Sequence, residues 1–536
     1  MSNPKAFPCD AGVIRSGPSV PACARRRIWV LTAAVMGSTL AFVDESVVNV
    51  ALPKIEGDLH TTLAAMQWVI NAYTLCMSAL LLLGGAAADR FGRRLIFVIG
   101  VSIFAAASLG CGLAANVQPL IAARAVQGAG AALLIPCSLA LIGAAYDEKE
   151  RGAAIGIWSG ASAIAAGAAP LLGGWLVDHW SWRVIFLINP LLAIPTLWIA
   201  LRQVPESRDP NAPAGIDWRG AVLAFAGLGC LVYGLIASSG LGWGHATVLT
   251  SVSVGAILLV AFLLVERGAA SPMMPLELFR SRTFSAVNLL TLLLYGALGA
   301  AFFFLPFLLI QARGYSATAA GGAYLPFTLV LGLLSRWSGR LVDRFGARRP
   351  LMAGPALTAC GFALLGSGDA RYGAVLLCMT VLGLGMAITV APLTTAVINA
   401  VPPQRTGVAS GINNAVASLG GLLLIAVLGT LALPAFDHAL ERQLSAREVS
   451  PGVRAAVEAA RGGFVLPAMP AGITSEERQR ARSIVADSLA GTINGALWIA
   501  AALALAGALS AAVGIKPPPR LTTSPPRSGA DPGGAE

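Results

Sequence analysis

The sequence predicts an all-α membrane protein with fourteen transmembrane helices, and three observations carry this prediction. Hydrophobic residues make up 56% of the 536 residues and charged residues only 12%, a balance far from that of a soluble globular domain. Apolar runs of about 20 residues, the length that a helix needs to cross a bilayer, recur along the whole chain. A basic motif also occurs twice at matched places, which indicates two homologous halves.

The spans follow from the apolar runs between charged residues, glycines and prolines, and the pattern indicates helices because barrel strands would be shorter and alternating. A first set of six is expected at 28–52, 64–88, 95–115, 118–145, 152–177 and 183–201. Two inserted spans follow at 218–239 and 246–266. The second set of six is expected at 284–310, 317–340, 350–367, 372–399, 406–431 and 488–514.

These spans divide the chain into domains. Residues 28–201 form the first six-helix half, 202–283 hold the two inserted helices with their linkers, and 284–514 form the second half. The tails 1–27 and 515–536 are rich in Pro, Ser and Gly and are expected to be disordered. Within the second half, residues 432–487 form a long outer loop in which short helices are expected, one of them starting at a capping box of Thr474 and Glu477.

The net charge of +11 is explained by orientation and not by nucleic-acid binding. With the amino terminus in the cytoplasm, 25 of the 37 Lys and Arg residues lie in the tails and inner loops, where basic residues accumulate. Cysteines and histidines are scattered, so neither a metal site nor another cofactor is expected. No lysine follows a glycine, which excludes a G-K-[ST] phosphate loop and leaves an ion gradient as the energy source.

The stretch GGAAADRFGRR (84–94) is echoed by SGRLVDRFGARR (338–349) at a constant offset of 254 residues. Each copy lies between the second and third helix of its set. Glycines permit a tight turn there, and we expect the charged residues to make contacts across the cytoplasmic ends of the two halves that bias the conformational equilibrium. The residues of this expected switch are Gly85, Asp89, Arg90, Gly92, Arg93, Arg94, Gly339, Asp343, Arg344 and Gly346.

These motifs resemble those of the major facilitator superfamily, in its fourteen-helix drug:proton antiporter branch (EmrB/QacA type). GGAAADRFGRR is similar to the signature G-x-x-x-D-R-x-G-R-R. VDESVVNVALPKI resembles the first-helix signature D-x-T-V-V-N-V-A-L-P of the branch, with Ser46 where Thr is usual. IAARAVQGAGAALLIP carries the R-x-x-Q-G pattern of helix four, and IDWRG and PLELFRSRTF match the inserted region. The resemblance implies the major facilitator fold and proton-coupled efflux of drugs or antibiotics by alternating access, without enzymatic activity.

The fifth-helix antiporter signature is only partly kept. Gly156, Pro170, Gly173 and Gly174 match it, but Ala165 and Ala169 stand where glycines belong. Uptake of a metabolite by symport therefore stays open as an alternative, as does export of lipids.

An acid and a base inside spanning helices are the main candidates for proton coupling. Asp44 and Glu45 are adjacent in the first span, and Asp44 lies roughly 12 Å inside its outer end. Arg124 enters the fourth span to a similar depth and needs an anionic partner, so pairing with Asp44 or Glu45 is expected. Desolvation favours a neutral carboxyl group and a nearby cation favours a charged one, so such an acid can alternate between proton and cargo.

Polar and aromatic residues of the spans are candidates for lining a substrate cavity, namely Asn49, Asn71, Gln127 and Phe303. The expected partners are protons, membrane lipids and small amphipathic substrates, cationic ones among them. The resemblance implies a multi-pass monomer in the bacterial inner or plasma membrane, with both termini in the cytoplasm.

Overall fold

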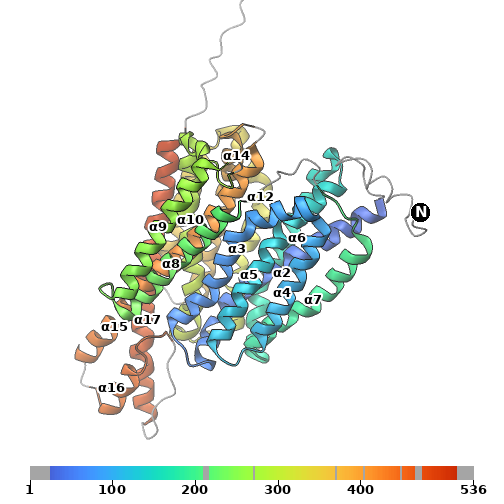
Figure 1. Ribbon diagram of the computed structural model, residues 1–536. Helices are drawn as coiled ribbons and strands as arrows, with labels where there is room; N and C mark the ends of the chain where they lie inside the picture. The colour runs from blue at the N-terminus through green and yellow to red at the C-terminus, as the bar shows by residue number, and fades with distance from the viewer. Residues whose placement is uncertain are drawn as a thin grey trace, which may run out of the picture.

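The computed structural model describes residues 24–208, 217–269, 272–368, 371–402, 405–446, 449–464 and 474–515, and the regular elements in these ranges are helices (Figure 1). Within them, thirteen helical segments are long and apolar enough to cross a membrane. The span expected at 350–367 is also helical, as α13 (Arg348–Gly366), although two arginines at its start make it less apolar. The predicted α-helical membrane fold is confirmed. Most of the two expected tails, 1–23 and 516–536, lies outside the described residues.

The first six long helices form one bundle. They are α2 (Ala24–Asp58), α3 (Leu63–Phe91), α4 (Arg93–Gly112), α5 (Val117–Ala145), α6 (Glu148–His179) and α7 (Trp182–Gln203). In this bundle α5 packs on α3 and α4, and α2 packs on α5, α6 and α7. Glycines bring α3 and α5 together, since a Cβ on Gly128 would lie 2.2 Å from the carbonyl oxygen of Tyr73. Because α2 packs on α5, Asp44 and Arg124 lie on neighbouring helices.

The inserted pair consists of α8 (Trp218–Leu241) and α9 (Ala246–Gly268), which pack on each other. The α8 helix also contacts α3 of the first bundle and α15 of the second, so the pair lies beside the junction of the two bundles (Figure 1).

The second bundle begins after the short helix η1 (Leu276–Arg280). It contains α10 (Arg282–Pro306) with the π-helical turn η2 (Phe307–Ala312), α11 (Ala317–Gly322), α12 (Leu325–Phe345), α13, α14 (Tyr372–Asn399), α15 (Thr406–Ala446) and α17 (Ser475–Gly514). The helix expected as one unit at 317–340 is divided in two. The break follows the pair Gly321–Gly322 and precedes Pro326, whose missing N–H favours a helix start.

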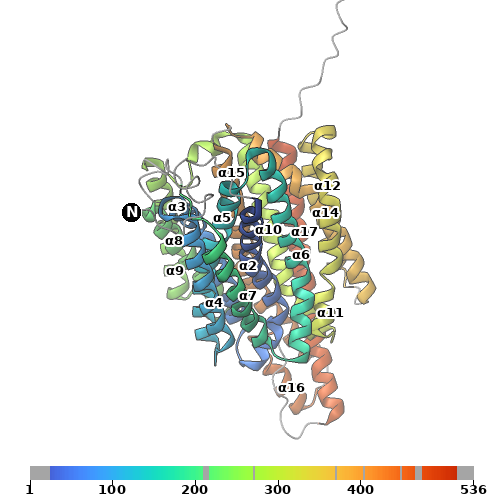
Figure 2. The ribbon, with the colours of Figure 1, turned by 90° about the vertical axis from the view of Figure 1, so that its right-hand side faces the viewer.

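The sequence predicts a loop with short helices in the region 432–487, whereas its described residues belong mainly to extensions of two long helices. The α15 helix runs on to Ala446, and α17 starts at Ser475, with the short helix α16 (Pro451–Glu458) between them. The expected capping box is present, because the Thr474 hydroxyl accepts from the backbone of Glu477 and the Glu477 carboxylate accepts from the backbone of Thr474. The end of α15, α16 and the start of α17 together form a hairpin, which projects beyond the other helices (Figures 1 and 2).

We call the end of the bundle that carries α16 the hairpin end, and the opposite end, with the turns at Gly92 and Gly346, the basic end. Side chains near the hairpin end join the two halves. The Gln67 amide donates to the carbonyl oxygen of Ile425 at 2.6 Å, and the backbone N–H of Phe464 donates to the Glu56 carboxylate at 2.8 Å.

A third contact between the halves at the hairpin end is made by Asp178, near the end of α6. Its carboxylate accepts from the backbone N–H groups of Ala317 and Thr318, at 3.0 and 2.7 Å, and from the Thr318 hydroxyl at 2.6 Å. An acid thus caps the start of α11, where N–H groups lack partners within the helix. The hairpin end is closed by these contacts.

Toward the basic end the two halves diverge along α6. Gly160, Gly167 and Gly174 are seven residues apart and therefore lie along one face of this helix. A Cβ on Gly174 would meet the backbone of Ala317 at 2.1 Å, and one on Gly167 would meet the side chain of Thr328 at 2.8 Å. A Cβ on Gly160 would have nothing within 4 Å among the described residues. The conformation is thus closed at the hairpin end and opens toward the basic end.

Candidate functional site

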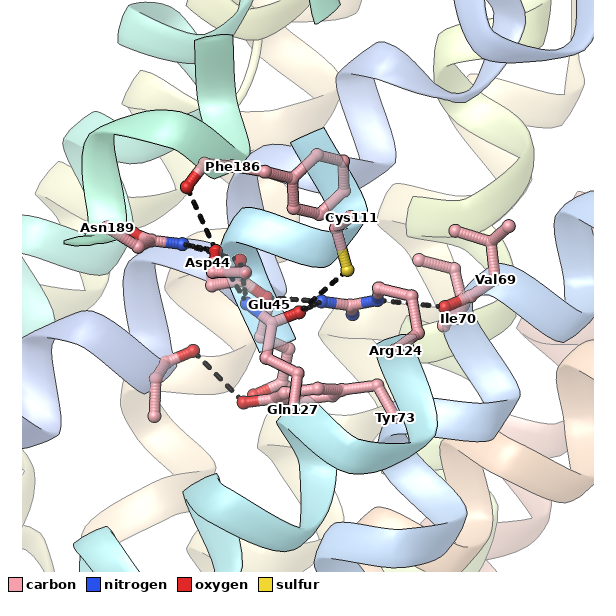
Figure 3. Close-up of polar contacts among 12 residues, drawn as sticks. Asp44, Glu45, Val69, Ile70, Tyr73, Cys111, Arg124, Gln127, Phe186 and Asn189 are labelled. Atoms are coloured by element: carbon pink, nitrogen blue, oxygen red, sulfur yellow. Dashed lines mark hydrogen bonds and ion pairs between the residues drawn. The ribbon is translucent and has the colours of Figure 1, made fainter. Parts of the chain in front are cut away.

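A buried carboxylate on α2 is the centre of a polar network in the first half (Figure 3). Asp44 is fully buried and forms an ion pair with Arg124 of α5. The amides of Gln127 and Asn189 donate to the Oδ1 atom of Asp44, at 2.8 and 2.9 Å. Three donors from two other helices therefore satisfy this one acid, as an ionised carboxylate away from water requires.

Arg124 is held from several sides and is only 1% exposed. Besides Asp44, its guanidinium donates to the carbonyl oxygen of Val69 at 3.0 Å and to the Gln127 side chain at 2.7 Å. The ring of Tyr73 lies 4.2 Å from its central carbon, within the range of a cation–π contact. The planar guanidinium thus connects α2, α3 and α5 in one arrangement.

A second layer fixes the amides that contact Asp44. Ser108 of α4 accepts from Gln127 at 3.1 Å and from Asn189 at 2.9 Å, and its hydroxyl donates to the carbonyl oxygen of Phe186 at 2.9 Å. Sequence reasoning missed Asn189, Ser108 and Tyr73. Asn189 could have been found, since it is the one amide in the apolar run 183–201, directly before Pro190.

The expected pairing of Arg124 with an acid of the first span is present, and the acid is Asp44. Glu45 differs from its neighbour: it is partly exposed, and no hydrogen bond or ion pair of its side chain is described. On the same face, the Asn49 amide donates to the carbonyl oxygen of Glu45 at 3.2 Å. The two adjacent acids therefore have different surroundings: Asp44 is buried in a network, and Glu45 is partly exposed.

The other residues expected in a substrate cavity lie in different surroundings. Gln127 belongs to the Asp44 network. Phe303 is instead fully buried, because its ring packs against Phe304 and Phe307 in the second bundle. Asn71 is fully buried on α3, and both polar atoms of its amide lack a partner within the described structure. An unsatisfied buried amide is costly, so Asn71 is a candidate for a group that finds its partner in another state.

The basic turns have matching geometry in the two halves. Gly92 and Gly346 both adopt positive φ, +124° and +69°, which favours glycine, and each N–H donates to a carbonyl oxygen four residues earlier. Arg90 lies over the ring of Phe91, as Arg344 lies over that of Phe345. Gly339, the repeat partner of Gly85, and Asp343 lie in α12, but the structure does not describe the surroundings of Gly339 or the side chain of Asp343.

The charged contacts that the structure describes for the first basic turn lie within the first half, and contacts across to the second half stay a prediction. Asp89 pairs with Arg93 on the next turn of helix at 2.8 Å. The Glu206 carboxylate accepts from the backbone N–H groups of Arg94 and Leu95, at 3.0 and 3.1 Å. The physical reason is that the halves diverge toward this end, so the nearest partners belong to the same bundle.

The fifth-helix residues lie at a tight contact between helices. A Cβ on Gly173 would meet Val47 of α2 at 2.0 Å, and a Cβ on Gly321 would meet the backbone oxygen of Pro170 at 2.0 Å. Gly174 faces α11 as described above, whereas Gly156 faces open space. Pro170, Gly173 and Gly174 therefore permit the approach of α6 to its neighbours near the hairpin end.

Two helical bundles with matching turns and a buried acid–arginine pair are the architecture of a membrane transporter built from two halves. The sequence matches the model of the major facilitator superfamily over residues 34–425, and the chain belongs to this family.

Similar proteins have names that refer to drugs and antibiotics. The chain is 35% identical to the multidrug resistance protein Stp of Mycobacterium tuberculosis over 78% of each chain. It is 34% identical to the tetracenomycin C resistance and export protein of Streptomyces glaucescens, over 90% of this chain and 92% of that one. The cephamycin export protein of Amycolatopsis lactamdurans is 38% identical over 75% of this chain and 84% of its own length.

Solved structures agree with the fold. A bacterial homologue of the human lysosomal transporter Spinster, in an inward-facing and unoccupied conformation, superposes with a TM-score of 0.65 at 18% identity. The match covers 91% of this chain and 98% of that chain. The xylose transporter XylE of E. coli, inward open, gives a TM-score of 0.58 at 14% identity, over 92% and 98% of the chains.

Proposed function

We propose that this protein is an exporter of drug-like or antibiotic-like compounds that is driven by protons, in the fourteen-helix branch of its family. The relatives named for multidrug resistance and antibiotic export support the cargo class. The excess of Lys and Arg at the basic end favours a cytoplasmic location of that end, in the inner or plasma membrane of a bacterium. The conformation described above is then inward-facing.

The observation that carries proton coupling is the buried network of Asp44. In the inward-facing state Arg124, Gln127 and Asn189 satisfy its charge. A change in the packing of α2 against α5 and α7 would remove donors from the carboxylate, and a carboxylate that loses donors in an apolar environment takes up a proton. Glu45, on the adjacent face and partly exposed, is placed to meet the cationic group of a substrate.

One transport cycle follows from these positions. Protonation of the Asp44 site from the outside accompanies the return to the inward-facing state, and release of the proton to the cytoplasm re-forms the ion pair with Arg124. Cargo entering from the basic end then occupies the space beside α6. Closure at the basic end and release of the Asp178 contacts open the hairpin end, and cargo leaves to the outside.

Transport in inside-out vesicles tests this function. Vesicles that contain the wild-type protein and have an acidic interior should accumulate an amphipathic cation such as ethidium. This accumulation should dissipate the pH gradient, which a pH-sensitive dye reports. Asp44→Asn should lose both activities at an equal amount of protein in the membrane, by about 100-fold or more if proton exchange is obligatory. Glu45→Gln, compared in parallel, should weaken transport of cations more than that of neutral compounds.

Three outcomes would contradict the proposal. Normal proton-driven transport by Asp44→Asn would remove the acid from the mechanism. Loss of proton coupling in Glu45→Gln but not in Asp44→Asn would assign the coupling role to Glu45. Release of compound from the vesicles with the pH gradient, in place of accumulation, would show uptake by symport.

A further inference from the structure

A cavity lies between α15 and α17, and none of its lining residues belongs to the Asp44 network. Its volume is about 710 Å³, within the range of pockets that hold small ligands. The walls run from Leu428 to Ala446 on α15 and from Asp487 to Ile499 on α17. At 1.5 Å per residue the α15 wall is about 27 Å long, so the cavity is an elongated crevice along the two helices.

Small residues open this crevice. A Cβ on Gly491 or on Gly495 would meet no atom within 4 Å among the described residues, although both positions face a neighbouring helix. Alanines line the opposite wall at 432, 435 and 439. Closely packed helices fill such space with larger side chains. The crevice therefore has room for a ligand.

The lining changes from apolar to charged along the crevice. Leu428, Leu431 and Ile499 lie at one end, and Arg442 and Asp487 lie toward the other. On α17 Asp487 is the last charged residue before an uncharged stretch that continues to Gly514. The uncharged stretch after Asp487 is long enough to cross a bilayer, so we infer that Asp487 and Arg442 lie on the head-group side of the crevice.

A buried polar atom in the wall also lacks a partner. Ser488 is 3% exposed and lines the crevice, yet its hydroxyl has no hydrogen bond in the described structure. Serines in spanning helices usually donate to a carbonyl oxygen of the preceding turn, as Thr492 does to Ser488 at 2.9 Å. The Ser488 hydroxyl is thus available to an acceptor inside the crevice.

We propose that the crevice binds one phospholipid of the surrounding bilayer, with an acyl chain along the glycine and alanine walls and the phosphate at Arg442. Three features fit this occupant. The apolar part of the crevice accommodates the acyl chain, and the Ser488 hydroxyl can donate to an ester oxygen. Arg442 can bind the anionic phosphate, since no ion-pair partner of Arg442 is present among the described residues. The site is separate from proton coupling and does not depend on the function proposed above.

Native mass spectrometry of the purified, delipidated protein tests the site, with phosphatidylglycerol and a diacylglycerol of the same chains as probes. Wild-type protein should retain phosphatidylglycerol more tightly than the diacylglycerol. Gly491→Leu fills the crevice and should weaken lipid binding about tenfold or more. Arg442→Gln should weaken phosphatidylglycerol roughly fivefold and leave the diacylglycerol unchanged.

Matched controls separate this site from general contact with lipid. Gly373→Leu adds the same side chain at another open glycine, on α14, and Arg482→Gln removes an exposed arginine of the same hairpin outside the crevice. Both should bind lipid as the wild type does. Equal binding by all variants, or equal affinity of the wild type for the two probes, would overturn the proposal. Retention of the cation tetraphenylphosphonium, lost in Gly491→Leu without any loss of lipid, would assign the crevice to cargo and would also overturn it.

Discussion

At the scale of single residues, Asp44 and Arg124 depend on each other. Both are buried, and each leaves an uncompensated charge if the other is removed. Breaking a buried pair from one side costs about 3–5 kcal/mol, whereas neutralising both members costs much less. The pair is therefore expected to behave as one unit in mutagenesis.

Arg124→Gln should lower the free energy of unfolding by about 3–5 kcal/mol, because Asp44 would then lie buried without its cation. The double variant Asp44→Asn with Arg124→Gln should regain most of this stability and still fail to couple transport to protons. Thermal unfolding of the purified proteins measures both effects. Equal stability of the single and the double variant would show that the two side chains do not interact as described.

The charged residues of this site could be predicted from the sequence, and of their uncharged partners Ser108 could not. An acid or arginine in an apolar span is rare and costly, so Asp44 and Arg124 stand out. Serines and amides occur in spans for many reasons, and many bond only to their own helix, as Thr196 does to Leu192. Nothing local distinguishes Ser108 from such residues, and its role follows only from the packing of α4 against α5 and α7.

At the scale of elements, the contact of α6 with α11 is one of the three contacts that close the hairpin end. Asp178 accepts three hydrogen bonds from residues at the start of α11. A hydrogen bond to a charged group contributes about 1.5–3 kcal/mol to stability. Near this contact, backbone meets backbone without intervening side chains at Gly174 and Gly321.

Asp178→Asn should shift the protein away from closure at the hairpin end, since a neutral side chain caps α11 less strongly. Distances between spin labels on the two halves, measured by electron–electron double resonance, report this shift. Asp58→Asn is the matched control, because Asp58 lies at the same end but pairs with Lys54 of its own helix. The same distance distribution in Asp178→Asn as in the wild type would show that the contact does not bias the equilibrium.

Gly174→Leu should prevent closure of the hairpin end and abolish transport, because its side chain would overlap the backbone of α11. Gly160→Leu, on the same face of α6 but in open space, should still allow this closure. Accessibility of single cysteines near the hairpin end to a membrane-impermeant thiol reagent measures the difference. Closure in Gly174→Leu equal to that in Gly160→Leu would contradict the helix contact.

The apolar runs predicted where the membrane-spanning helices lie, because the thickness of the bilayer sets the length of such a run. They did not predict where a helix ends if it continues beyond the bilayer. The run 406–431 ends where hydrophobicity falls, whereas α15 continues to Ala446 as an amphipathic helix. Its apolar side chains Phe436, Leu440 and Leu444 are buried. Tertiary packing, and not hydropathy, determines this extension.

At the scale of the whole molecule, the two halves and their repeated turns could be predicted, but the conformational state could not. Under the proposed function, the same sequence supports an outward-open and an inward-open state that differ by a few kcal/mol, so no local pattern selects one. That charges cross between the halves when the basic end closes stays a prediction. Those charges contact their own bundle while the end is open.

Proton release on binding of cargo tests the central claim, exchange of a proton for cargo at Asp44, most directly. Purified protein in weakly buffered detergent solution is mixed with a transported cation, and a pH indicator measures the protons released per molecule. The wild type should release protons in proportion to bound cargo, with binding weakening as the pH falls, and Asp44→Asn should bind cargo without release. Equal release by the wild type and Asp44→Asn would contradict the claim.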